Sequence, residues 1–168
     1  MMSTTIEDLL CSGKPSMICV GRVSDASQRE ALPAQKIRVT EYAKQYGIPY
    51  TYLEFDESAY KGSRKRFWDG VLTPIANASD LVILVFDKID RFSRDSSGEE
   101  KSFMQKRLRD GKIELHFPSD NLYITKESPA TDLFRLDIGI ALGSYYASSI
   151  RDNVKRRFDQ KLADKEWP

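Results

Sequence analysis

The sequence has little cysteine and little histidine. Its 168 residues include two cysteines, Cys11 and Cys19, and a single histidine, His116. The spacing of the cysteines matches no zinc-binding pattern, and Cys19 lies in an apolar segment, where a buried and inert thiol is the usual state. These features argue against a zinc site and indicate a reducing compartment such as the cytoplasm.

The sequence also has no long apolar run and almost no net charge. No stretch approaches 18 apolar residues, and the N-terminus lacks the basic-then-apolar layout of a secretory signal, so we expect no contact with a membrane. The 26 basic and 25 acidic residues give a formal net charge of +1, so nucleic-acid binding must be judged from local clusters. The 40% hydrophobic and 30% charged residues predict a globular, soluble protein.

Short apolar runs alternate with helical patterns along most of the chain. We expect strands at residues 17–20, 50–55 and 81–86, and helices at 32–46, 67–75 and 97–109. Pro33 suits the first turn of the first helix, Gly47 suits its end, and Pro74 predicts a kink in the second helix. This order predicts an α/β fold with a doubly wound, mostly parallel central sheet flanked by helices.

The two ends of this core are predicted to differ from its centre. Residues 1–15 are mostly polar and are expected to form a flexible leader, which leaves residues 16–127 as the α/β core. Residues 113–117 and 122–125 are expected to form late edge strands, with antiparallel pairing as one alternative. His116 would then be a core or surface histidine on an edge strand.

A single long helix is predicted for residues 128–168. Ser128 and Pro129 suit an N-cap followed by the first helical position, and no further proline occurs before the end. Thirty-odd helical residues span roughly 50 Å, more than the roughly 30 Å diameter of a small domain, so this helix must project from the core. Its projecting half carries an apolar residue at every fourth position: Ile150, Val154, Phe158 and Leu162. A second copy of the chain is the natural cover for this stripe.

Two glycines lie four residues apart in the earlier half of this helix. Gly139 and Gly143 would share one face of the helix and permit the close approach of another helix. Packing within the same chain is the alternative.

A serine and several arginines follow two of the expected strands. Arg22 and Ser24 come after the first strand, and Arg91 and Arg94 come after the third. A serine hydroxyl needs a base or strong stabilisation of developing charge, and His116 is remote in sequence. Guanidinium groups bind the non-bridging oxygens of phosphate. The pattern therefore favours phosphoryl transfer onto Ser24, with Asp90 orienting an arginine or exchanging a proton.

Taken together, these segments resemble the serine site-specific recombinases, the resolvases and invertases, and among them the large serine recombinases. The resemblance runs from about Met17 to the C-terminus. It rests on Arg22-Val23-Ser24 with Gln28 and Gln35, Ser63-Arg64, Lys88 to Asp95, Ser128-Pro129-Ala130, Asp152 to Arg156 and Trp167-Pro168.

This resemblance implies a resolvase-like catalytic domain in which Ser24 attacks a DNA phosphodiester and forms a 5′-phosphoserine intermediate. Arg22, Arg91 and Arg94 would bind the scissile phosphate, Arg64 would assist from a loop, Gln35 would support the site, and Asp90 would transfer or orient a proton. No metal or other cofactor is implied. Contacts to the DNA backbone are expected from basic residues of the core and the long helix: Lys61, Lys65, Arg66, Lys88, Lys155, Arg156 and Arg157.

The resemblance also implies partners. Family members act on double-stranded DNA as homodimers that pair into a tetramer, sometimes with a directionality factor, so Ile150, Val154 and Phe158 are expected at the dimer interface. Residues 128–168 would be the dimerisation helix that leads to a DNA-binding region absent from this chain. Such proteins are encoded by bacteria, phages or other mobile elements and act in the cytoplasm.

Two other functions remain open from the residues alone. Asp87 and Asp90 follow a strand and could hold magnesium in a metal-dependent phosphoryl-transfer domain. Alternatively, the chain is a non-catalytic module that dimerises through the long helix and contacts DNA phosphates with the basic stretch 61–66.

Overall fold

A computed structural model describes residues 6–23, 26–56, 63–92 and 99–164. Five strands form one sheet in the order β2-β1-β3-β4-β5. Their bounds are Ser16–Val23 (β1), Tyr50–Asp56 (β2), Val82–Phe86 (β3), Ile113–Phe117 (β4) and Leu122–Ile124 (β5). The first four strands in this order are parallel, whereas β5 runs antiparallel to β4. The predicted α/β fold with a mostly parallel sheet is confirmed.

The prediction that residues 113–117 form an edge strand is wrong. β4 pairs with β3 on one side and with β5 on the other, so it is an inner strand. The reason is that the short strand β5 turns back through a left-handed residue, Asn121, and covers the edge that β4 would otherwise expose. His116 is consequently buried in the sheet.

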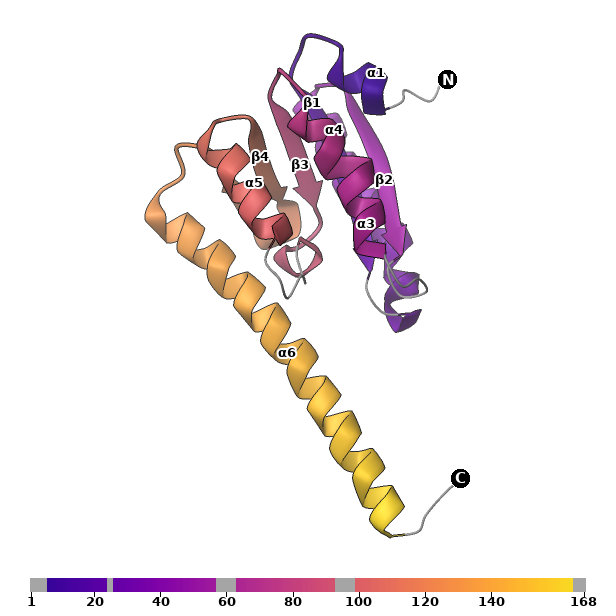
Figure 1. The fold of residues 1–168 in the computed structure, drawn as a ribbon. Coiled ribbons are helices and arrows are strands. Elements are labelled where there is room, and N and C mark those ends of the chain that lie inside the picture. Colours follow the sequence, from indigo (N-terminus) through magenta and orange to yellow (C-terminus); the bar gives the residue numbers. More distant parts are fainter. Residues whose placement is uncertain (1–5, 24–25, 57–62, 93–98, 165–168) are drawn as a thin grey trace.

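Helices cover both faces of the sheet. The α-helices are α1 (Ile6–Leu10), α2 (Leu32–Tyr46), α3 (Ser63–Phe67), α4 (Thr73–Ala76), α5 (Glu99–Arg109) and α6 (Ala130–Ala163); the other helical turns are η1 (Ala26–Ala31), η2 (Trp68–Leu72), η3 (Ile89–Arg91) and η4 (Pro118–Asp120). Helices α3–α5 lie on one face of the sheet (Figure 1) and α2 on the other. Because side chains alternate along a strand, odd-numbered residues of β1 and β3 pack with α2, and even-numbered ones pack with α3–α5.

Part of the expected flexible leader is ordered. Residues Ile6–Leu10 form α1, and both Leu9 and Leu10 are buried in the larger core cluster. Two adjacent leucines at the end of an otherwise polar segment therefore dock this helix against the domain, and the prediction of a loose leader is corrected for these residues.

The predicted features of α2 are confirmed. Pro33 lies in its first turn, and Gly47 ends it with a positive φ of 75°. The predicted kink at Pro74 takes the form of a π-helical turn, η2, directly before it. The Thr73 N–H donates to the Trp68 carbonyl, five residues back. A proline ring clashes with the carbonyl four residues before it, and this wider turn moves that carbonyl aside. The helix expected from residue 67 also begins earlier than predicted, because α3 starts at Ser63.

The long helix begins one residue later than predicted. Pro129 is the N-cap, and its carbonyl accepts hydrogen bonds from the Asp132 and Leu133 amides. Ser128 instead accepts a hydrogen bond from the Thr125 amide at 2.8 Å, so it closes the turn before the helix. No helix among the described residues is both long and apolar enough to span a bilayer.

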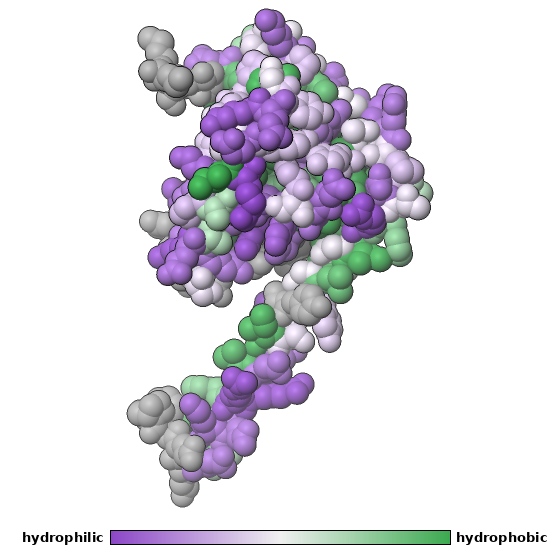
Figure 2. All heavy atoms as spheres, turned by 180° about the vertical axis from the view of Figure 1, so that it is seen from behind, coloured by the Kyte–Doolittle hydropathy of each residue, from purple (hydrophilic) through white to green (hydrophobic). Residues whose placement is uncertain are grey.

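Helix α6 has 34 residues, and its C-terminal half projects past the core, as predicted (Figure 1). The stripe of Ile150, Val154, Phe158 and Leu162 is 49–65% exposed in the single chain. Seen from behind, apolar side chains are visible along the projecting part of the helix (Figure 2). Cover by a second copy remains a prediction.

The near half of α6 packs on η3 through a glycine. A Cβ atom on Gly139 would lie 2.8 Å from Cγ2 of Ile89, whereas a Cβ on Gly143 would lie 3.9 Å from its nearest neighbour, Cβ of Asp90. At Gly139 the structure therefore shows the alternative stated above, which is close packing within the same chain.

We expect Gly139→Ala to lower the free energy of unfolding by about 1–2 kcal/mol, because overpacking against the stiff Ile89 outweighs the better helix propensity of alanine. Gly143→Ala is the matched control and should be neutral or stabilising by up to about 1 kcal/mol. Urea denaturation of both variants measures the difference. Equal stabilities would contradict the Gly139–Ile89 contact.

Candidate active site

Arg22 lies at the carboxyl end of β1 and is held by groups from three other elements. Its Nη1 donates to the Phe92 carbonyl at 2.9 Å and to Glu100 at 3.1 Å, and its Nη2 contacts both Glu100 oxygens at 3.2 Å. Its Cζ lies 4.2 Å from the centre of the Phe67 ring, within cation–π range. Arg22 is only 6% exposed. The guanidinium is therefore fixed in place before any ligand arrives.

Gln35 holds the backbone of the same residue. Its Oε1 accepts a hydrogen bond from the Arg22 amide at 3.2 Å, and its Nε2 donates to the Arg22 carbonyl at 3.4 Å. The pairing of β1 with β3 ends at Val20, so the buried Gln35 amide takes the place of a strand neighbour beyond that point. This contact anchors the end of β1 to α2, in a position consistent with the supporting role expected for Gln35.

Arg91 and Asp90 lie in η3, immediately beyond the end of β3. Arg91 donates to Gln28 Oε1 at 2.8 Å, and its Nε lies 3.7 Å from Asp90 Oδ1. The Asp120 carboxylate accepts a hydrogen bond from the Ile89 amide at 2.7 Å and fixes the turn. Because Arg22 contacts the Phe92 carbonyl, the end of β1 and the turn that follows β3 lie side by side here.

Several predicted site residues lie outside the described part of the structure. Ser24, Arg94 and Lys61 fall in undescribed segments, and the Arg64 side chain is also not described. The structure therefore gathers Arg22, Gln35, Asp90 and Arg91 at one sheet edge. Among the predicted DNA contacts, the exposed residues are Lys65 and Arg66 on α3, Lys88 before η3, and Lys155, Arg156 and Arg157 on the projecting half of α6.

Glu100 is a site neighbour that the sequence analysis did not identify. It lies in the first turn of α5 and is 2% exposed. The sequence does contain a signal for it, because Glu100, Met104 and Leu108 are spaced by four residues and form the buried face of α5. A carboxylate on that face needs a buried cation as its partner.

The family model described as "Resolvase, N terminal domain" matches residues 17–167. The chain belongs to this family. As a resolvase domain it is an enzyme domain of site-specific DNA recombination, a class that binds DNA and self-associates. No curated protein matches the chain.

Solved structures of recombinases are similar to this resolvase domain at low identity. A resolvase-family site-specific recombinase from Streptococcus pneumoniae is 18% identical with a TM-score of 0.48, over 90% of this chain and 97% of the other. The N-terminal catalytic domain of TP901-1 integrase is 19% identical with a TM-score of 0.47, over 79% and 97%. The C-terminal catalytic domain of ISC1926 TnpA, an IS607-like serine recombinase, is 19% identical with a TM-score of 0.45, over 89% and 99%.

The two aspartates of the magnesium alternative are arranged differently in the resolvase domain. Asp87 continues the odd-numbered face of β3 toward α2, where Arg38 donates to both of its oxygens at 2.6–2.7 Å and Ser119 donates at 2.6 Å. Burial raises the pKa of Asp87, but the bonds from Arg38 and Ser119 outweigh burial and place this pKa below its ordinary value. Asp90 instead faces α6 near Gly143. Asp87 is thus already committed to a guanidinium.

His116 is a buried structural residue of the resolvase domain. Its Nδ1 lies 2.8 Å from the Tyr42 hydroxyl, and its Nε2 lies 3.0 Å from Glu114 Oε2. A neutral ring with its proton on Nε2 satisfies both contacts, since it accepts from Tyr42 and donates to Glu114. Burial lowers the pKa of His116, and Glu114 offsets only part of this shift.

We expect acid to destabilise the domain through His116. Because the folded-state pKa lies below the unfolded value of 6.5, the unfolded state binds the proton first, and stability falls as pH drops below about 6.5 until the folded-state pKa is passed. His116→Gln offers one acceptor and one donor to the same neighbours but does not titrate. Urea denaturation at pH 7.5 and 5.5 should show a larger loss for the wild type than for this variant. Parallel losses would contradict this role.

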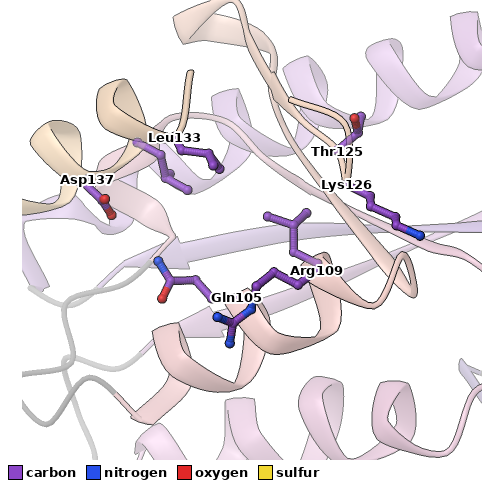
Figure 3. A pocket seen from close by; sticks show the side chains of 8 residues that line it. Gln105, Arg109, Thr125, Lys126, Leu133 and Asp137 are labelled. Carbon is purple, nitrogen blue, oxygen red and sulfur yellow. The ribbon is translucent and has the colours of Figure 1, made fainter. Parts of the chain in front are cut away.

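A hollow of about 240 Å³ lies away from the arginine cluster, between α5 and the start of α6 (Figure 3). Leu108, Leu133 and Leu136 give it an apolar lining, and Arg109, Lys126 and Asp137 add charged groups. None of the predicted catalytic residues lines it.

Proposed function

We propose that this resolvase domain cleaves double-stranded DNA by direct attack of Ser24 on a phosphodiester. The bond between Ser24 Oγ and phosphorus forms as the bond to the 3′ oxygen breaks, giving a 5′-phosphoserine and a free 3′-hydroxyl. The serine proton leaves and the 3′ oxygen gains one, with Asp90 as the transferring or orienting group. Reversal of these steps after strand exchange rejoins the DNA.

The observation that carries this proposal is the buried Arg22 at the end of β1, two residues before Ser24, joined to η3 through the Phe92 carbonyl. Phosphoryl transfer builds up charge on non-bridging oxygens, and fixed cations stabilise that charge most when they need no reorganisation. Arg22 and Arg91 supply two such cations at one sheet edge. Arg94 and Arg64 are proposed to bind the same phosphate. Gln35 supports the site because its side chain accepts a hydrogen bond from the Arg22 amide.

The assembly is proposed to be a homodimer that pairs into a tetramer on two DNA sites, with a directionality factor as a further partner. The exposed apolar stripe of α6 supports the dimer, because Ile150, Val154 and Phe158 would otherwise stay in water. Lys155, Arg156 and Arg157 on the same helix, together with Lys61, Lys65, Arg66 and Lys88 of the core, would contact the DNA backbone. The cytoplasm of a bacterial host is the proposed location.

The magnesium alternative is less well supported. Both oxygens of Asp87 already accept hydrogen bonds from Arg38, and Asp87 and Asp90 face different helices. A metal would have to displace a bidentate guanidinium to reach Asp87. The non-catalytic module remains the alternative that the experiment below tests.

We expect the full-length protein to form a covalent adduct with a suicide DNA substrate that carries its crossover site, in excess chelator. Ser24→Ala should abolish the adduct entirely, because no other group in the proposal can form the phosphoserine bond. A denaturing gel measures the adduct. The control is Ser119→Ala, which removes a serine hydroxyl that donates to Asp87 and should leave adduct formation intact.

Cleavage that requires magnesium and survives Ser24→Ala would overturn the proposal in favour of a metal-dependent site. Specific binding with no cleavage on a verified site would favour the non-catalytic module.

A further inference from the structure

Glu100 is a buried carboxylate that the proposed chemistry leaves without a role. It is 2% exposed, and its two oxygens lie 3.1–3.2 Å from both Nη atoms of Arg22, which is itself 6% exposed. Taking two charges out of water costs nearly as much as their pairing returns, so a buried ion pair adds little stability compared with apolar residues. Stability alone therefore does not explain why Arg22 and Glu100 form a buried ion pair.

Several groups hold different parts of Arg22 in place. Gln35 fixes the backbone, the Phe67 ring supports one face of the guanidinium, and the Phe92 carbonyl accepts from Nη1. Glu100 alone among these groups contacts both Nη atoms and carries charge. A bidentate carboxylate fixes both the plane of a guanidinium and its rotation about the last bonds of the side chain.

We propose that Glu100 is a positioning residue for DNA cleavage, which acts by fixing the orientation of the Arg22 guanidinium. Glu100 does not touch the DNA; it holds Arg22 so that a phosphate arriving at the sheet edge meets the cation in a single orientation. A guanidinium left to rotate would have to be ordered during the reaction, and that cost would slow cleavage without weakening the binding of DNA through other residues. This inference rests on the proposed function.

The kinetic test uses Glu100→Gln, which keeps the shape of the side chain but removes its charge. In single-turnover reactions of the full-length protein with the suicide substrate, we expect adduct formation to slow at least tenfold while the affinity for DNA changes less than threefold. Asp87→Asn is the matched control, because it also removes a buried carboxylate that binds an arginine, on the opposite face of the sheet. Its cleavage rate should match the wild type at a temperature where both are folded.

A second measurement needs no DNA. In the ¹⁵N spectrum of the arginine side chains, the Arg22 Nη protons of the wild type and of Asp87→Asn should be resolved and exchange slowly with water. Glu100→Gln should broaden or lose these signals. Glu100→Asp, which retains the charge on a shorter side chain, should give an intermediate cleavage rate and intermediate protection of the Arg22 protons. If Glu100→Gln does not fold, both measurements are made on Glu100→Asp instead.

Each outcome decides the inference. Wild-type or faster cleavage by Glu100→Gln, an equal loss in Asp87→Asn, or Arg22 signals that stay protected without the carboxylate would overturn it. If the wild type forms no Ser24-dependent adduct, the proposed function fails by itself, and the spectra still decide whether Glu100 orients Arg22.

Discussion

Replacing Phe86 with alanine is expected to lower the free energy of unfolding by about 3–5 kcal/mol. Phe86 ends β3, is fully buried, and its ring lies 5.4 Å from that of Phe92, 5.9 Å from Phe117 and 6.4 Å from Phe67. These rings come from β3, β4, α3 and the residue after η3, so their neighbours cannot collapse into the space that the substitution leaves. Because small domains are stable by only about 5–15 kcal/mol, the variant should be close to unfolding.

Guanidinium denaturation followed by circular dichroism measures this loss. The matched control is Phe134→Ala, because Phe134 is 64% exposed on α6 and should cost less than about 1 kcal/mol in the single chain. A loss at Phe86 no larger than at Phe134 would mean that the aromatic cluster is not packed as described.

Replacing Arg22 with methionine is expected to cost a similar amount, about 3–5 kcal/mol, because Glu100 would stay buried without the guanidinium. The variant Arg22→Met with Glu100→Leu removes both charges and should recover much of the stability, since apolar residues of similar size suit the face of the Phe67 ring. The part not recovered is the hydrogen bond that the Phe92 carbonyl accepts from Arg22. Both variants should fail to form the DNA adduct. Equilibrium denaturation and the adduct gel thus separate folding from function at one residue.

The control for this pair is Arg38→Met. Arg38 is 47% exposed, and Asp87 keeps the Ser119 hydroxyl after its loss, so the cost should be clearly smaller. An Arg22→Met variant as stable as the wild type would contradict the expectation that Glu100 stays buried and charged without the guanidinium.

Much of the fold could be predicted because its signals are local. The apolar run of β3 and the proline-free stretch of α6 each specify an element without reference to the rest of the chain. The inner position of β4 could not be predicted in this way, because it depends on whether β5 turns back to pair with it. The docking of α1 depends likewise on a distant apolar surface that receives Leu9 and Leu10.

The site was predictable to the extent that it follows strand ends. Arg22 lies at the end of β1 and Arg91 in the turn that follows β3, and parallel strands bring their carboxyl ends to one edge. The pairing of Arg22 with Glu100 joins residues 78 positions apart, and no local pattern specifies which buried cation a buried carboxylate will meet. The sequence also could not show that the side chains of Asp87 and Asp90 point apart, since this depends on the turn that η3 makes.

The contact between Gly139 and Ile89 makes α6 a lever arm. About 24 residues, or roughly 36 Å of helix, lie beyond this contact, so a tilt of about 10° at the glycine carries the far end by about 6 Å. The fulcrum is a side chain adjacent in sequence to Asp90 and two residues from Arg91. Because α6 packs on η3 near Gly139 and again near Gly143, a displacement of the far end of the helix would also act on the turn that carries Asp90 and Arg91.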